Sequence, residues 1–189
     1  MAIKLSSLLK NNSDKSFFSQ HIAAYAKALA MHLNDEKTYN ELFNLPKASP
    51  IDPHKHPLNQ IAKAIYAKLN QLHVDGQITG FELQILNQDL QSFTNVTGAC
   101  ERIKNTPIPY SYSSFIKKFI FFYIMTLPFG YSIQLGYVVV PMVIFVFYIL
   151  SSLELIAEEI EDPFGTDDND LPTYKMAENI GKNVQDLLF

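Results

Sequence analysis

The chain has 189 residues, of which 48% are hydrophobic and 18% charged, and its formal net charge is −4. That length suits one domain with a sizeable core, whereas the mild acidity and scattered lysines disfavour nucleic acid, because phosphate binding requires a concentrated basic surface. The single cysteine, Cys100, excludes an intrachain disulfide, so the sequence gives no sign of an oxidising compartment.

The first hundred residues predict amphipathic helices of a bundle. A helix over residues 17–33 contains no Gly or Pro, and its apolar residues recur at helical spacing. That apolar face consists of Ile22, Tyr25, Ala26, Leu29 and Leu33. A second helix begins near Pro57, whose missing N–H is harmless in a first turn, and ends near Gly76. Its inner face is predicted to consist of Leu58, Ile61, Ile65, Leu69 and Leu72.

A third helix is predicted over residues 79–93, and three of its side chains are expected to point inward, namely Phe81, Ile85 and Leu86. The segment Thr106-Pro107-Ile108-Pro109 follows it at a short distance. Each proline disfavours helical geometry in the residue before it. This segment is therefore expected to be an extended or kinked entry to the oily region.

Residues 119–153 contain no ionisable group other than tyrosine, whereas most charged and amide side chains lie in residues 1–110. This division is typical of a membrane protein with a cytosolic part. One helix over the oily region would extend about 50 Å, too long for a hydrocarbon core of about 30 Å. A hairpin is therefore favoured, with its turn in LPFGYSIQLG, residues 127–136, and spans at about 112–129 and 133–155. The alternative is a buried helix pair in a soluble protein, which so long an uncharged stretch disfavours.

Charge sets the expected orientation of this hairpin. The turn contains no Lys or Arg, and four basic residues lie just before the first span, namely Arg102, Lys104, Lys117 and Lys118. The positive-inside rule then places both termini in the cytoplasm. We therefore predict an all-α integral protein of the cell membrane, with a cytosolic helical region over 1–109, a transmembrane hairpin over 110–157 and an acidic cytosolic segment over 158–189.

The stretch EEIEDPFGTDDNDLP, residues 158–172, places many carboxylates directly after the second span. A continued helix would put Glu154, Glu158 and Glu161 on one face, and Pro163 would end it. Clustered oxygen ligands around a turn suit a hard cation such as Ca²⁺, although the spacing is not that of an EF-hand. A solvated acidic rim is the alternative, and the residues alone favour it.

Other candidate sites are weaker. His54 and His56 lie two residues apart and His73 follows, but no cysteine or third nearby histidine completes a transition-metal site, so an exposed loop is favoured. Cys100 stands without the motif that supplies a base to a nucleophile, and the chain has no glycine-rich phosphate loop. The sequence therefore predicts that the chain is not an enzyme and needs no cofactor, unless the acidic stretch binds Ca²⁺.

The sequence CERIKNTPIPYSYS, together with LPFG and EEIEDPFGTDDNDLP, resembles the second half of a bestrophin-type channel subunit of the bacterial branch, in the order and spacing of that family. Weaker similarity extends back through DGQITGFELQILNQDL to about Phe17. The resemblance implies an all-helical subunit of a homopentamer around one pore, with both termini cytosolic. Such channels pass chloride and other anions, and bacterial relatives can favour monovalent cations. The implied partners are the lipid membrane, further copies of the chain and the permeant ions.

The resemblance also implies particular sites. A cytosolic constriction, which would gate by narrowness and dewetting, falls in the third helix near Ile78, Phe81 and Ile85. Animal members of the family form a calcium clasp after the last span, partly with a backbone carbonyl of the extreme N-terminus that this chain lacks. Alignment through Pro163-Phe164-Gly165 gives the matching positions here as Glu159, Asp162, Asp167 and Asp170.

The chain departs from the family pattern in one respect. Family subunits have four membrane helices, and the first hairpin, which supplies the hydrophobic neck, has no counterpart in this sequence. We therefore expect a truncated subunit or a misassigned start. The alternative functions are a non-conducting, membrane-anchored helical protein that binds partners and, less favoured, a metal-dependent membrane enzyme that uses the carboxylates.

Overall fold

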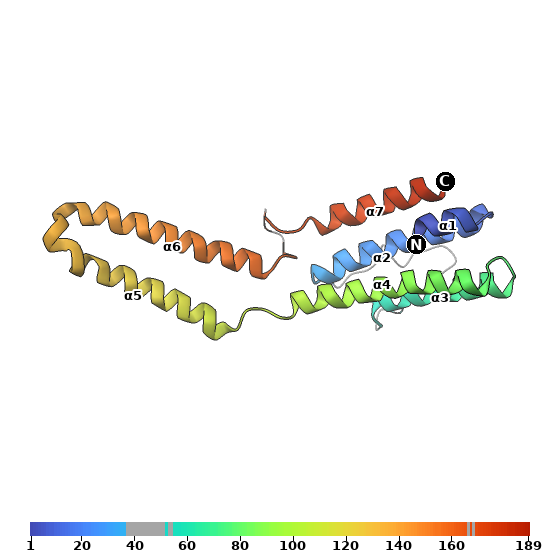
Figure 1. Cartoon of the computed structure of the whole chain (residues 1–189), viewed down its shortest axis with the longest axis horizontal. Coiled ribbons are helices and arrows are strands. Elements are labelled where there is room, and N and C mark those ends of the chain that lie inside the picture. Colours follow the sequence, from blue (N-terminus) through green and yellow to red (C-terminus); the bar gives the residue numbers. More distant parts are fainter. Residues whose placement is uncertain (37–51, 53–54, 166, 168) are drawn as a thin grey trace. The chain divides into compact units, whose positions relative to one another are not determined.

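Helices make up the regular structure throughout the part of the chain that the computed structural model describes (Figure 1). The described residues are 1–36, 52, 55–165, 167 and 169–189. In chain order the elements are α1 (Ala2–Leu8), α2 (Asn12–Leu33), α3 (Pro57–Val74), α4 (Gly80–Lys104), α5 (Tyr110–Leu135), the 3-10 turn η2 (Gly136–Val138), α6 (Val139–Glu161) and α7 (Thr173–Leu188). The predicted all-α class is confirmed.

The chain forms two compact units. The bundle consists of Met1–Ile103 together with Pro172–Phe189, and the hairpin unit consists of Lys104–Leu171. The C-terminal residues thus divide between the two units, whereas the sequence predicted one acidic segment over 158–189. Each unit has its own packing and is described by itself.

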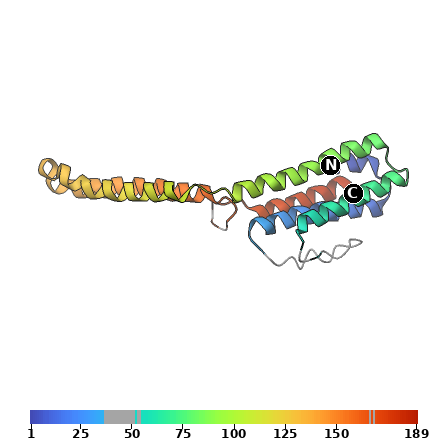
Figure 2. The same ribbon diagram turned by 90° about the horizontal axis from the view of Figure 1, so that it is seen from below.

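In the bundle the helices lie side by side (Figures 1 and 2), and α2 packs against both α3 and α7. The start of α2 is fixed by Asn11, whose side chain accepts a hydrogen bond from the Ser13 N–H at 3.0 Å. Such a cap satisfies one of the amide groups that a helix leaves unpaired at its start. Residues of α2 that the sequence predicted on the apolar face are buried or half-buried.

The α3 face that the sequence predicted forms the centre of the bundle core. Its five residues are at most 2% exposed, namely Leu58, Ile61, Ile65, Leu69 and Leu72. Burying each such side chain stabilises the fold by about 1.5–3 kcal/mol. From α4 the core receives Leu86 and Leu90, both fully buried.

The connection between α3 and α4 positions the predicted constriction residues. Gly76 lies just past the end of α3 with φ of +71°, a left-handed conformation that glycine adopts without steric cost. Thr79 and Glu82 then begin α4 as a capping box. The Glu82 carboxylate accepts from the Thr79 N–H at 2.7 Å, and the Thr79 hydroxyl accepts from the Glu82 N–H at 3.3 Å. The Thr79 N–H, together with the Thr79 hydroxyl that donates to the same carboxylate at 2.8 Å, holds the pKa of Glu82 below its usual value.

Two helices of the bundle differ from expectation. α4 continues to Lys104, beyond the predicted end at residue 93, because Gly98 is tolerated within it and the first proline comes only at Pro107. α7 was predicted only as part of an acidic tail, yet it packs along α2 and buries three side chains, Ala177, Val184 and Leu188. At the start of α7, Thr173 accepts a hydrogen bond from the Asn34 side chain at 2.9 Å.

The hairpin unit consists of α5 and α6, which pack against each other along their length (Figure 1). The predicted turn over residues 127–136 is wrong in position. α5 continues through Pro128, and the chain reverses at Gly136–Val138. A proline within a helix removes one hydrogen bond and does not always end it, whereas Gly136 supplies the positive φ of 53° that the reversal requires.

The stretch Tyr110–Glu161 is long and apolar enough to cross a membrane, and only 6% of its most apolar window is buried. α5 has 26 residues and α6 has 23, so they extend about 39 and 35 Å. Each exceeds a hydrocarbon core of about 30 Å. The hairpin exposes large apolar side chains along both helices, for example Phe121 of α5 and Ile144 of α6.

Candidate functional site

The predicted constriction residues differ sharply in exposure. Ile78 is 3% exposed and belongs to the bundle core, and Ile85 is half-buried. Phe81 is 72% exposed in the first turn of α4, so the prediction that it points into the bundle is wrong. Of these three side chains, that of Phe81 is the most accessible to another molecule.

Acidic residues at the end of α6 and in the loop after it line one cavity of about 510 Å³ in the hairpin unit. It includes all four predicted calcium positions, Glu159, Asp162, Asp167 and Asp170. Two hydrogen bonds shape the loop. The Asp170 carboxylate accepts from the Asp167 N–H at 2.6 Å, and the Asn169 side chain donates to Glu159 at 2.9 Å. The carboxylates thus share a cavity, but two of them are engaged by donors from the loop itself.

The open end of the hairpin unit is held by charged groups. The Lys117 ammonium lies 3.1 Å from Glu154 and 2.9 Å from Glu158. Glu161 accepts from the Ile108 N–H at 2.9 Å. The carboxylates that the sequence predicted on one face of α6 therefore bind α5 and the segment just before it, and they fix the register of the two helices.

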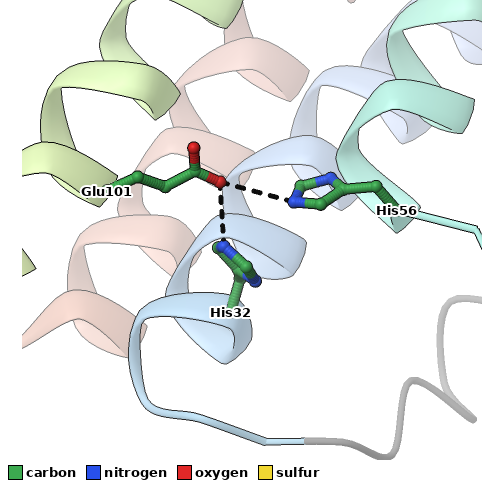
Figure 3. A group of neighbouring side chains, drawn as sticks. All are labelled: His32, His56 and Glu101. Atoms are coloured by element: carbon green, nitrogen blue, oxygen red, sulfur yellow. Dashed lines mark hydrogen bonds and ion pairs between the residues drawn. The ribbon is translucent and has the colours of Figure 1, made fainter. Parts of the chain in front are cut away.

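A second cluster of potential ligands lies in the bundle, where α2, the start of α3 and α4 meet (Figure 3). The Glu101 Oε1 atom lies 2.9 Å from Nε2 of His32 and 3.4 Å from Nε2 of His56. The two imidazole rings are 4.8 Å apart, edge to face. Among the described residues, this is the one group of His, Cys, Asp and Glu whose ligand atoms lie within 4.8 Å of one another.

Only one member of this cluster, His56, was singled out from the sequence as a possible ligand, and it was set beside His54 and His73. His73 lies at the other end of α3, where its Nδ1 donates to the Ile78 carbonyl at 3.0 Å. His54 lies outside the described residues. The partners that the structure gives to His56 are separated from it by 24 and 45 positions in the sequence, so no spacing rule could connect them.

A family comparison accounts for almost the whole chain. The family described as Bacterial/Fungal Bestrophin protein matches residues 2–186. The chain belongs to this bestrophin family. The resemblance found in the sequence is thereby confirmed. The prediction that the chain is not an enzyme is confirmed as well, because the related bestrophins are channel-forming membrane proteins.

Curated relatives of this bestrophin carry a functional name. The chain is 31% identical over 182 residues to a voltage-dependent anion channel-forming protein of Nostoc sp., and the match covers 95% of the chain and 59% of that relative. It is 30% identical over 158 residues to the protein of the same description, YneE, from Escherichia coli K12, covering 82% of the chain and 52% of the relative. The chain spans between 37% and 59% of the length of the curated relatives that it matches.

Solved structures confirm the fold of the bestrophin. The crystal structure of a bacterial bestrophin homolog from Klebsiella pneumoniae aligns with a TM-score of 0.91 at 26% identity, covering 99% of this chain and 71% of that one. The hairpin and the bundle therefore both have counterparts in a solved bestrophin, and the chain is an all-helical membrane protein.

Proposed function

We propose that the chain is a subunit of a homopentameric bestrophin channel that conducts anions passively. In this proposal α5 and α6 both cross the membrane and both termini are cytosolic, so the protein is multi-pass. The observation that carries it is membership of a family whose curated relatives are named voltage-dependent anion channel-forming proteins. Lipid, further copies of the chain and the permeant ions are its partners, and no nucleic acid is expected among them.

The exposed surface of the hairpin unit supports this arrangement. Its apolar side chains are exposed along both helices, with examples in Phe122 and Ile133 of α5 and Phe145 and Tyr148 of α6. Exposed apolar area on this scale is unfavourable in water and requires lipid or partner helices. Passive conduction also needs no nucleophile, base or cofactor, in keeping with the side chains of the chain.

Phe81 is the best candidate for the cytosolic constriction. It lies in the first turn of a helix whose start is fixed by a capping box, and its ring is exposed. Five copies around an axis would present five phenyl rings, an apolar ring of the kind that gates by narrowness and dewetting. Ile85, one turn further along α4, would line the next level. Ile78 packs in the bundle core and would support the ring from behind.

Reconstitution tests the proposal. The purified protein is placed in chloride-loaded liposomes, and chloride efflux is followed after addition of a potassium ionophore, while light scattering gives the oligomer mass. We expect efflux and a protein mass five times the chain mass of 21.5 kDa. Phe81→Ala should increase efflux, whereas Val74→Ala, at an exposed apolar position at the end of α3, should not. A monodisperse pentamer without efflux would favour the alternative of a non-conducting, membrane-anchored interaction protein.

We also propose that the acidic cavity after α6 binds Ca²⁺ through Glu159, Asp162, Asp167 and Asp170. Its support is that all four line one cavity, since Ca²⁺ takes six to eight oxygen ligands. Asp167→Asn together with Asp170→Asn should abolish any calcium dependence of the efflux. An unchanged calcium response in this double variant would contradict the assignment.

A further inference from the structure

We propose that His32, His56 and Glu101 form a binding site for a divalent transition-metal ion such as Zn²⁺, which links α2, α3 and α4 in the bundle. The metal would be bound by Nε2 of each imidazole and by the carboxylate. The site is separate from the acidic cavity of the hairpin unit and from the constriction residues. It therefore adds a ligand to the protein that the proposed conduction does not require.

The distances suit such an ion. Zinc bonds to imidazole nitrogen and carboxylate oxygen are about 2.0–2.2 Å, so neighbouring ligand atoms of a tetrahedral site lie about 3.3–3.5 Å apart. Here the Glu101 oxygen lies 2.9 and 3.4 Å from the two Nε2 atoms, and all three ligand atoms are within 4.8 Å. Shifts of about one ångström in the side chains would complete the geometry.

The ligands come from ends of separate helices. His32 lies in the last turn of α2, His56 is the residue before α3, and Glu101 lies in the last turn of α4. Figure 3 shows both imidazoles directed at the same carboxylate oxygen. Two of the ligands lie on helices and the third directly precedes one, so the three atoms are held near one another before an ion arrives.

The donor set selects the class of metal. Two histidines and one glutamate, with water in the fourth position, are a known zinc arrangement, and imidazole also suits Ni²⁺, Co²⁺ and Cu²⁺. The three side chains are 29%, 34% and 36% exposed, so water can reach the ion. Ca²⁺ and Mg²⁺ prefer oxygen ligands in larger number. One carboxylate beside two imidazole nitrogens suits neither of these ions.

The surroundings also limit the affinity. A histidine that binds a metal usually donates its other ring nitrogen to an acceptor, and loss of that bond costs about 10–100-fold in affinity. Nδ1 of His56 is buried without a hydrogen-bond partner among the described residues. We therefore expect a dissociation constant on the order of micromolar, weaker than that of structural zinc sites.

Calorimetry of the purified full-length chain, without a histidine tag and stripped with EDTA, tests the site. ZnCl₂ should bind at one ion per chain, and His32→Gln, His56→Gln or Glu101→Gln should each weaken binding at least tenfold. His73→Gln is the matched control, because this exposed histidine lies in the last turn of α3, the helix that His56 precedes. The substitution is predicted to leave zinc binding unchanged. Circular dichroism confirms that each variant is folded.

Two further readouts separate a metal site from a hydrogen-bonded ion cluster. Co²⁺ should give the strong visible absorption of four- or five-coordinate cobalt in the wild type and lose it in His32→Gln. Zn²⁺ at a hundredfold excess over its dissociation constant should raise the melting temperature by about 5–10 °C. Wild-type affinity in all three variants, a weak octahedral cobalt spectrum, or equal binding of Ca²⁺ would each overturn the proposal. None of these readouts depends on ion conduction.

Discussion

Replacing Lys68 by Met should destabilise the bundle strongly, although the side chain lies near the surface of α3. The Lys68 ammonium lies 2.6 Å from the Asp14 carboxylate in the first turn of α2. The two side chains are 19% and 6% exposed. The substitution keeps most of the apolar stem but leaves the Asp14 carboxylate buried without its cation.

The expected magnitude follows from the difference in burial. Breaking a buried ion pair by removing one partner costs about 3–5 kcal/mol. Because Lys68 is about one-fifth exposed, we reduce this to about 2–3 kcal/mol for Lys68→Met. Asp14→Asn should cost only about 1–2 kcal/mol, because the free ammonium can extend to water. The double substitution leaves no buried charge, so its cost should be smaller than the sum of the two.

Thermal melts followed by circular dichroism, in one detergent and at one scan rate, measure these effects. At about 2–4 °C per kcal/mol for a chain of this size, Lys68→Met should lower the melting temperature by about 4–12 °C. Lys63→Met, at an exposed lysine of the same helix, is the control and should change it little. A Lys68→Met shift no larger than that of the control, or additive effects in the double variant, would refute the reasoning.

Three smaller predictions concern other contacts. Burial lowers the pKa of His21 below its unfolded value of 6.5, so the unfolded state binds the proton more readily. The free energy of unfolding of the bundle should therefore fall by up to about 1.4 kcal/mol per pH unit as the pH falls below 6.5. Melting temperatures at several pH values should show this slope, and His21→Leu should reduce it. Tyr25→Phe should cost about 1–2 kcal/mol in thermal melts, because it leaves the buried Thr97 hydroxyl without its 2.8 Å partner; Thr97→Val in the same chain should recover part of that loss. Gly165→Ala would place a methyl group 2.6 Å from the Asp170 carboxylate, so amide exchange in the acidic loop should accelerate; unchanged exchange would show that the loop accommodates the methyl group without a clash.

The helices whose sequence pattern is uninterrupted were predictable. The α3 face was correct in all five of its residues, because no Gly or Pro in Leu58–Leu72 breaks the helical period and all five are Leu or Ile at helical spacing. The hairpin was predictable for a similar reason, since no Lys, Arg, Asp or Glu interrupts residues 119–153. Its turn was misplaced because Pro128 and its neighbours read as a break, whereas only Gly136 has the backbone conformation of a reversal.

Features that depend on tertiary contact were not predictable. α7 was missed because its buried residues are few and separated by polar ones. These residues stabilise the helix through their packing against α2. Phe81 has the spacing of a core residue, yet it is exposed, whereas Ile78 before it and Leu86 after it are both buried in the core. The His32, His56 and Glu101 cluster joins three helix ends, so its geometry exists only once the bundle has folded.

Pro128 has a consequence for how α5 must be oriented. Because proline has no N–H, the carbonyl oxygen one turn earlier, on Ile124, loses its normal helical donor. In the transmembrane arrangement proposed above, hydrocarbon offers no replacement, and an unsatisfied carbonyl there costs several kcal/mol. The side of α5 that carries this oxygen should therefore turn away from lipid, toward a neighbouring helix or a water-filled passage. The missing N–H of Pro128 thus determines the rotation of the whole helix about its axis.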